Sequence, residues 1–198
     1  MGHREEKQSM KLKIRPAEER DIPEIKHLTD IGISEDFYSE EDFRKMLTGE
    51  GDVLHVAVDE DKDELVVSFF YTFALPRRTA LRLLHIPDLP DEVLGLQDDD
   101  IVAAFKTAST RKEYRGMGLV SDFYKSMEAR VREMGAKVIL GTALVLKDGK
   151  IPIHNIMHAH GFEGIYPLDK PWKDVPGYCP YCGNDPCTCE GMLYCKRL

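Results

Sequence analysis

The chain has 198 residues, of which 42% are apolar and 31% are charged, a composition typical of a globular protein with one well-filled domain. Its formal net charge of −8 argues against nucleic-acid binding by charge neutralisation. No apolar run approaches the roughly 20 residues that a membrane-spanning helix needs, and the first residues lack a signal-peptide pattern. A cytoplasmic protein without membrane contact is therefore expected.

Hydrophobic periodicity and the positions of glycine and proline predict a single domain over residues 11–198. Residues 1–10 are expected to be a disordered or tag-like N-terminus. Strands are predicted at 11–15, 52–58, 64–75, 100–110, 136–145, 161–167 and 192–198. Helices are predicted at 18–32, 34–49, 118–135 and 150–160. Two prolines interrupt the segment 76–98, which is expected to be a surface insertion or a lid over a substrate.

The stretch Arg115-Gly116-Met117-Gly118 joins a predicted strand directly to a predicted helix. Glycines allow a tight turn and leave bare N–H groups at a helix N-terminus, which suits phosphate oxygens. The stretch lacks the P-loop spacing GxxxxGK[ST], and the next strand lacks the terminal acidic residue of a Rossmann fold. A tight turn that binds no ligand is the other alternative.

The stretch EYRGMGLVSDF resembles the acyl-CoA signature of the GNAT N-acetyltransferase superfamily, whose pattern is roughly [QR]-x-x-G-x-[GA]. Arg115, Gly116 and Gly118 fit this pattern, whereas Glu113 stands where Gln or Arg is commonest. The order of the predicted elements resembles the same family, as do the stretches HGFEGIYP and GMLYCKRL. The resemblance implies an α/β (α+β) GNAT fold: a mixed central sheet of six to seven strands, flanked by helices and splayed between strands 4 and 5.

The resemblance also implies a site for acetyl-CoA as a cosubstrate. The pantetheine arm would pair with the backbone of the fourth strand, and the pyrophosphate would lie on the amides of the glycine turn. The implied cofactor-binding residues are Thr107, Ala108, Ser109, Thr110, Arg115, Gly116, Met117, Gly118, Leu119 and Val120. Arg111 is a further candidate for a phosphate contact, with a solvated charged patch as the alternative.

The implied reaction is direct attack of an amine on the acetyl thioester, which needs a base for the ammonium and an acid for the leaving thiolate. Family bases often lie near the start of the fourth strand, where this sequence has Asp98, Asp99 and Asp100. Asp100 is the first choice, since crowding by two other carboxylates would raise its pKa. The alternative is an exposed acidic turn.

The tyrosine that often serves as the acid in this family falls on Met157, which is a departure from the pattern. His158 is the substitute that we expect, with His154 and His160 beside it, because an imidazole titrates near neutral pH. Ordinary surface histidines are the alternative interpretation.

Four of the five cysteines fall in the stretch YCPYCGNDPCTCE, inside a predicted insertion at 173–190 between the last two strands. The CPYCG part resembles a zinc knuckle, so a structural zinc site of Cys179, Cys182, Cys187 and Cys189 is predicted. A redox-sensitive dithiol or disulfide, or free thiols, are the alternatives. Cys195 is expected to be a buried apolar residue, or a ligand in place of another cysteine.

These observations predict an N-acetyltransferase that moves an acetyl group from acetyl-CoA to a small-molecule or peptide amine. The alternatives are a non-catalytic acyl-CoA-binding protein and a zinc-knuckle interaction module on a GNAT-like fold. A nucleic-acid partner is not expected, and a homodimer is left open.

Overall fold

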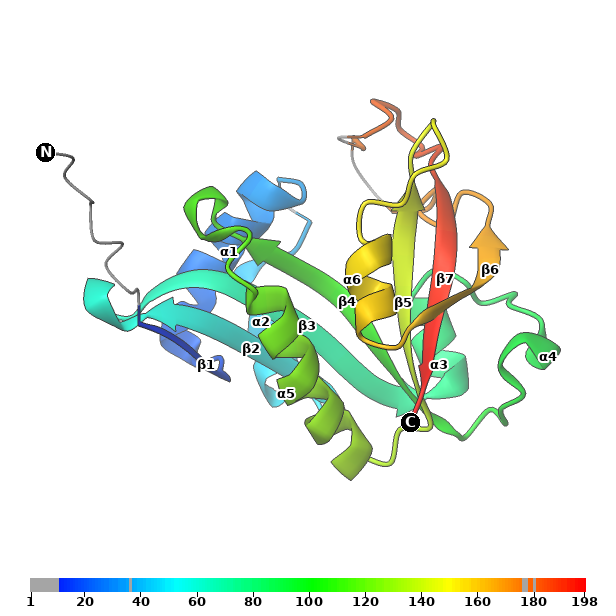
Figure 1. Ribbon diagram of the computed structural model, residues 1–198, viewed down its shortest axis with the longest axis horizontal. Coiled ribbons are helices and arrows are strands. Elements are labelled where there is room, and N and C mark those ends of the chain that lie inside the picture. The colour runs from blue at the N-terminus through cyan, green and yellow to red at the C-terminus, as the bar shows by residue number, and fades with distance from the viewer. Residues whose placement is uncertain (1–10, 36, 176–177, 180) are drawn as a thin grey trace, which may run out of the picture.

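The structure of the chain is a computed structural model that describes residues 11–35, 37–175, 178–179 and 181–198 (Figure 1). The N-terminal segment predicted at 1–10 lies outside these residues. The strands are β1 (Leu12–Pro16), β2 (Asp52–Asp59), β3 (Leu65–Pro76), β4 (Ile101–Thr110), β5 (Val138–Val145), β6 (Glu163–Leu168) and β7 (Glu190–Arg197). The α-helices are α1 (Ile22–Gly32), α2 (Glu40–Thr48), α3 (Arg77–Leu83), α4 (Asp91–Leu94), α5 (Leu119–Glu133) and α6 (His154–Ala159).

The strands form one seven-stranded sheet in the order β1-β2-β3-β4-β5-β7-β6, which confirms the predicted mixed sheet flanked by helices. Only β4 and β5 run parallel, and their backbones pair over Val102–Phe105 and Val138–Gly141. Beyond Phe105 and Gly141 the two strands diverge in a V, which Figure 1 shows at the centre of the sheet. The separation leaves part of the β4 edge without a strand partner.

Helices cover both faces of the sheet and bury two hydrophobic clusters. On one face α1, α2 and α3 pack on the sheet, and Leu28 and Phe43 are fully buried there. On the other face, which Figure 1 presents to the viewer, α5 and α6 bury Phe123 and Met157. Leu28 lies three residues after Ile25 on α1, and this helical spacing of apolar residues orients the helix.

The segment from α3 to α4 is part of the core, so the expectation of a surface insertion was wrong. Its apolar side chains Leu81, Leu84, Ile86, Leu89 and Leu94 are all buried in the cluster under α1 and α2. Arg77, itself buried, holds the segment together through ion pairs with Asp91 and Asp98. Apolar residues spread through a proline-interrupted segment have no single period, so the sequence did not reveal their common burial.

The four clustered cysteines lie between β6 and β7, which are neighbouring antiparallel strands. Figure 1 shows this segment above the open side of the V between β4 and β5. None of the helices that the structure describes has the length and apolar composition needed to cross a bilayer.

Candidate active site

The opening between β4 and β5 is a groove with a volume of about 400 Å³. Its walls come from residues 105–110 of β4, from Gly141 and Thr142 of β5, and from side chains of α5 and α6. Gly32, at the end of α1, lies against Ser109: a Cβ added to Gly32 would stand 2.1 Å from Ser109 Oγ. Residues 107–110 line the groove along the part of β4 beyond its pairing with β5.

The glycine turn lies at the end of the groove where α5 begins. Gly116 and Gly118 have φ values of +78° and +83°, and no atom lies within 4 Å of a Cβ added to either. Gly118 is the N-cap of α5, with no side chain capping the helix, so the first N–H groups have no partner within the helix. Arg115 donates from Nε to the Thr110 carbonyl at 3.1 Å, which holds its guanidinium beside the groove. The turn has the geometry of an anion-binding site.

A second cavity of about 350 Å³ adjoins the groove from the other side of the sheet. Both cavities are lined by Gly32, Lys106, Ala108 and Thr142, so they meet where β4 and β5 separate. The remaining walls come from the residues after α1 and from the segment between β6 and β7. They are mainly apolar or aromatic, and they include Ile33, Phe37, Trp172, Val175, Tyr178 and Tyr181; Leu144 of β5 adds a further apolar side chain.

Lys106 stands at the junction of the two cavities because of a bulge in β4. Tyr71 pairs with Thr107 while the next residue, Thr72, pairs with Phe105, so Lys106 is an extra residue in its strand. Its Nζ donates to the Leu83 carbonyl at 2.6 Å. Burial disfavours the ammonium and lowers the pKa of Lys106 to about 8.

Solved structures share this arrangement over nearly the whole chain. The structure of Arabidopsis thaliana NAA60 in complex with a bisubstrate analogue matches with a TM-score of 0.70 at 12% identity, over 94% of this chain and 98% of that one. The NatC complex bound to Gag peptide and CoA matches with a TM-score of 0.67 at 14% identity, over 96% and 99%. A GCN5-related N-acetyltransferase from Kribbella flavida matches with a TM-score of 0.59 at 17% identity, over 94% and 98%. No family model and no curated protein matches the sequence.

This chain has the GNAT fold. The parallel pair β4–β5, its separation and the turn into α5 are the features of that fold that the groove is built from. The two cavities share lining residues at the point where β4 and β5 separate.

Met157, which stands where a GNAT tyrosine is often found, is contacted by a tyrosine from a different helix. The hydroxyl of Tyr124 on α5 donates to the Met157 sulfur at 2.9 Å, and both side chains line the groove. Phe105 packs edge-on against the Tyr124 ring, and burial raises the pKa of Tyr124. A hydroxyl group is thus present in the groove although the α6 position lacks one.

The predicted base, Asp100, and the predicted acid, His158, line neither of the two cavities. Asp100 precedes β4 at the end opposite the glycine turn, roughly 20 Å along the strand from Lys106. The expected rise in the pKa of Asp100 is wrong: a hydrogen bond with Lys137 and another from the Gln97 amide lower it. His158 is exposed on α6, with its ring 6.0 Å from that of His154.

The two other candidate histidines, His154 and His160, and Arg111 have partners within the fold. His154 Nδ1 lies 2.7 Å from the Tyr194 hydroxyl, and His160 Nε2 lies 3.0 Å from Ser121 Oγ. Arg111 pairs with Glu24 and donates to the Val66 carbonyl at 3.0 Å. These contacts connect α1 and α6 to the sheet and the end of α6 to α5, so the side chains already serve the fold.

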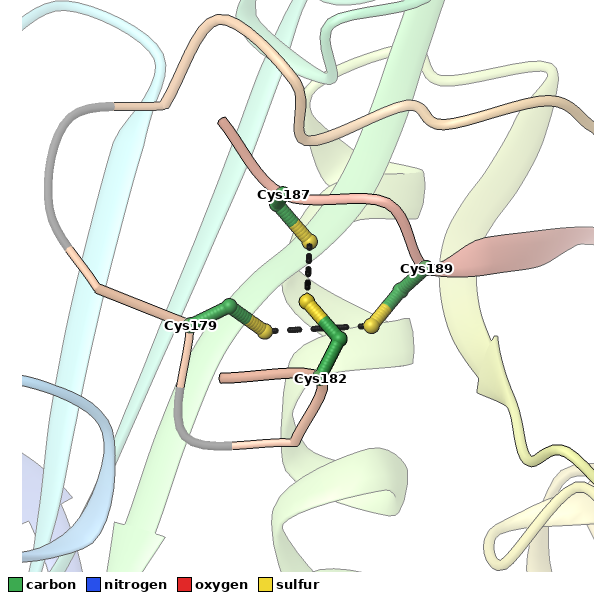
Figure 2. A group of neighbouring side chains, drawn as sticks. All are labelled: Cys179, Cys182, Cys187 and Cys189. Atoms are coloured by element: carbon green, nitrogen blue, oxygen red, sulfur yellow. Dashed lines mark hydrogen bonds between the residues drawn. The ribbon is translucent and has the colours of Figure 1, made fainter. Parts of the chain in front are cut away.

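The four clustered cysteines point toward one another, as Figure 2 shows. The sulfur of Cys179 lies 3.7 Å from that of Cys189, and the sulfur of Cys182 lies 3.9 Å from that of Cys187. All four sulfur atoms lie within 4.8 Å of one another. Zn–S bonds of about 2.3 Å in a tetrahedron require sulfurs separated by about 3.8 Å, so this set fits a metal ion. Cys195 is buried in β7 and lies outside the set.

Sequence reasoning missed Lys106, Tyr124 and Thr142, which line the groove. A lysine within the apolar run of the fourth strand was a signal, because an interior strand position rarely holds an unpaired charge. Tyr124 sits on the core-facing side of α5, where its pattern is that of an ordinary buried aromatic residue. Thr142 carried no signal, since it lies in a uniformly apolar strand.

Proposed function

We propose that this protein is an N-acetyltransferase that transfers an acetyl group from acetyl-CoA to an amine by direct attack. The observation that supports this most is the meeting of two cavities at the separation of β4 and β5. Acetyl-CoA in the groove would carry its thioester to that meeting point. An acceptor in the second cavity would bring its amine to the same place.

The cosubstrate would be held mainly by backbone groups. The pantetheine amides pair with the unpartnered edge of β4 at Thr107, Ala108, Ser109 and Thr110. The pyrophosphate lies on the amides from Arg115 through Gly118 to Val120, where the positive end of the α5 dipole favours an anion. The Arg115 guanidinium adds a charge-assisted contact.

Tyr124 is the residue of the groove best suited to protonate the leaving thiolate. Its hydroxyl lines the groove from the α5 side, and burial keeps it protonated. The roles predicted for Asp100 and His158 stay predictions that this geometry does not support. Phe105 and Met157 surround the hydroxyl with apolar atoms, which excludes water from the thiolate.

The cysteine set would hold a structural zinc ion with Cys179, Cys182, Cys187 and Cys189 as ligands. The segment 173–190, which we take as an insertion in a single domain of residues 11–198, has few apolar residues of its own. The ion would supply its stability and would fix the wall of the acceptor cavity.

The acceptor would be a peptide or small-molecule amine. Two of the solved structures with the same fold hold ligands of this kind, a bisubstrate analogue and a Gag peptide. The apolar and aromatic wall of the second cavity suits an acceptor with an apolar side chain beside its amine.

The test is a pair of measurements on the purified full chain. Calorimetry should detect acetyl-CoA binding, and a thiol-detecting assay should show CoA release that depends on an added amine. Amino acids, short peptides and polyamines form the acceptor panel. Acetyl-CoA binding without amine-dependent release from any acceptor would contradict the proposal.

That outcome would favour a non-catalytic acyl-CoA-binding protein, the second candidate function. The observation behind it is Met157, which replaces a hydroxyl at the position where the family often has tyrosine. The hydroxyl of Tyr124 next to Met157 is the reason that we rank catalysis first.

A further inference from the structure

Lys106 is a half-buried cation, and among the described residues it has no counter-ion. Among the described residues, no carboxylate forms an ion pair with it, and its ammonium has the Leu83 carbonyl as its hydrogen-bond acceptor. An ammonium that is partly withdrawn from water loses part of its hydration, and no anion offsets that cost here.

The bulge in β4 gives this lysine its position. An extra residue in a strand is left out of the backbone pairing, and its side chain can be aimed differently from its neighbours. Phe105 faces the α5 side of the sheet, whereas the Lys106 ammonium reaches Leu83 at the end of α3 on the opposite side. Lys106 therefore projects from the groove proposed for acetyl-CoA toward the second cavity proposed for the acceptor, and it lines both.

Other titratable groups surround the lysine at a greater distance. His85, after α3, is close enough that the Lys106 charge lowers its pKa, in addition to burial, while Asp174 raises it. Tyr38, between α1 and α2, lies 3.4 Å from Thr107 Oγ1. The acceptor cavity adds Tyr178, Tyr181 and three of the clustered cysteines, Cys179, Cys187 and Cys189. None of these groups governs the lysine, because burial alone lowers its pKa to about 8.

We infer that Lys106, in its neutral form, is the general base that removes a proton from the acceptor ammonium. This inference rests on the proposed acetyltransferase function and names a further catalytic residue for it. The base must lie where the amine meets the thioester, and among the charged side chains of the described residues Lys106 alone lines both cavities.

The proton balance of the step is complete. The ε-amine of Lys106 takes one proton from the R–NH3+ acceptor and becomes an ammonium. The freed nitrogen lone pair attacks the thioester carbon, a C–N bond forms, and the C–S bond breaks as the electron pair leaves with sulfur. The second N–H proton neutralises the thiolate by way of the Tyr124 hydroxyl, and Lys106 returns its proton to solvent.

This assignment also selects an acceptor class. Two ammonium groups at the same site repel each other, so the acceptor must lose its proton easily. An α-amino group has an ordinary pKa of about 7.7–8.0, whereas an alkyl amine such as a lysine side chain has one of about 10.4. The expected acceptor is therefore the α-amine of an amino acid or peptide with an apolar first side chain, rather than a lysine side chain or a polyamine.

The test compares Lys106→Arg and Lys106→Gln with the wild-type chain and with Lys137→Gln as a matched control outside both cavities. Arginine keeps the positive charge but cannot accept a proton. Both Lys106 variants should lose roughly 10²–10⁴-fold in kcat while they bind acetyl-CoA like the wild type. A Lys106→Arg variant that retains wild-type kcat would overturn the inference and make Lys106 an anchor for a substrate anion.

The pH profile provides a second readout that does not depend on a variant folding. In the wild type, kcat should rise with pH through about 8, because only the deprotonated lysine can act as a base. The midpoint should stay near 8 for acceptors of different amine pKa, and a midpoint that follows the acceptor would overturn the inference. Absence of amine-dependent turnover in the wild type would instead refute the proposed function itself, which separates the two failures.

Discussion

Gly118 sets the shape of the turn at the start of α5, where we propose that the pyrophosphate binds. Its positive φ of +83° belongs to the left-handed region, and the space where a side chain would stand is empty. That empty space is where a pyrophosphate would approach the helix amides. In the proposed site, Gly118 would favour binding because it has no side chain in that space.

We expect Gly118→Asp to abolish acetyl-CoA binding, since a carboxylate would stand where the phosphates lie and would repel them. The matched control is Gly149→Asp, at a loop glycine with φ of +80° and equally open surroundings. Both changes cost about 1 kcal/mol of folding free energy through backbone strain. Calorimetric titration with acetyl-CoA should show lost affinity in the first variant alone, and equal affinity in both would contradict the assigned site.

Tyr124 presents the hydroxyl that the α6 position lacks. Replacing it with phenylalanine keeps the ring that packs on Phe105 and removes the group that would protonate the thiolate. We expect Tyr124→Phe to lower kcat by about 10²-fold with an unchanged Kd for acetyl-CoA. Steady-state kinetics with calorimetry measures both quantities, and an unchanged kcat would remove Tyr124 from the mechanism.

Tyr114→Phe serves as the comparison for a buried tyrosine outside the groove. Its hydroxyl donates to the buried Asp59 at 2.6 Å and accepts from Lys62 at 2.8 Å. Its loss should lower the free energy of unfolding by about 1–3 kcal/mol and leave kcat intact. Chemical denaturation would measure that change, so a loss of stability is distinguished from a loss of chemistry.

At the scale of elements, the cysteine segment between β6 and β7 supplies one wall of the second cavity, where we propose that the acceptor binds. Tyr178 and Tyr181 are about 70% exposed and lie beside the clustered cysteines, so their positions depend on how the segment is held. If the cysteines hold a metal ion as proposed, that ion would supply much of the order of this segment.

We expect Cys182→Ser to lower the zinc content of the purified protein and to raise KM for the acceptor, with little effect on acetyl-CoA affinity. Cys195→Ser is the matched control, because Cys195 lies in β7 outside the cluster. Elemental analysis and acceptor kinetics test both variants. Full zinc content with four-sulfur coordination in the Cys182→Ser protein would rule out this ligand set.

The predicted elements agree closely with the observed ones wherever a local pattern specifies them. The helix at 118–135 and the apolar strand at 136–145 have clear periods, and they correspond to α5 and β5. The bulge at Lys106 could not be predicted, since it arises from the register between β4 and β3, which is a contact between distant parts of the chain. The raised pKa expected for Asp100 failed for the same reason, because Lys137 approaches only in the folded sheet.

The features of the candidate site that could be predicted are likewise those formed by residues close in sequence. The glycine turn and the cysteine set were predicted because each is formed by residues close in sequence. The junction of the two cavities was not, because it brings together Gly32, Lys106 and Thr142 from three separate elements. Local motifs thus predicted candidate binding sites, whereas side chains from separate elements, such as Lys106 and Thr142, come together only in the folded protein.

At the scale of the whole molecule, acetyl-CoA should stabilise the fold as well as occupy it. A ligand at 100 times its Kd that binds only the native state adds about 2.7 kcal/mol to the free energy of unfolding. For a chain of this size that corresponds to a rise in Tm of roughly 5–11 °C. Differential scanning fluorimetry with and without acetyl-CoA measures the shift, and a Gly118→Asp protein that shows the same shift would contradict the proposed site.

The short pairing between β4 and β5 has a mechanical consequence. The sheet consists of two parts, β1–β4 and β5–β7, which are joined by the four residue pairs from Val102–Val138 to Phe105–Gly141 and by a backbone hydrogen bond from Lys137 to Ile101. A cosubstrate bound in the groove would connect the two parts of the sheet beyond this short paired region. We therefore expect the two parts to move more in the free protein, and amide hydrogen exchange along 106–110 and 142–145 should slow when acetyl-CoA binds.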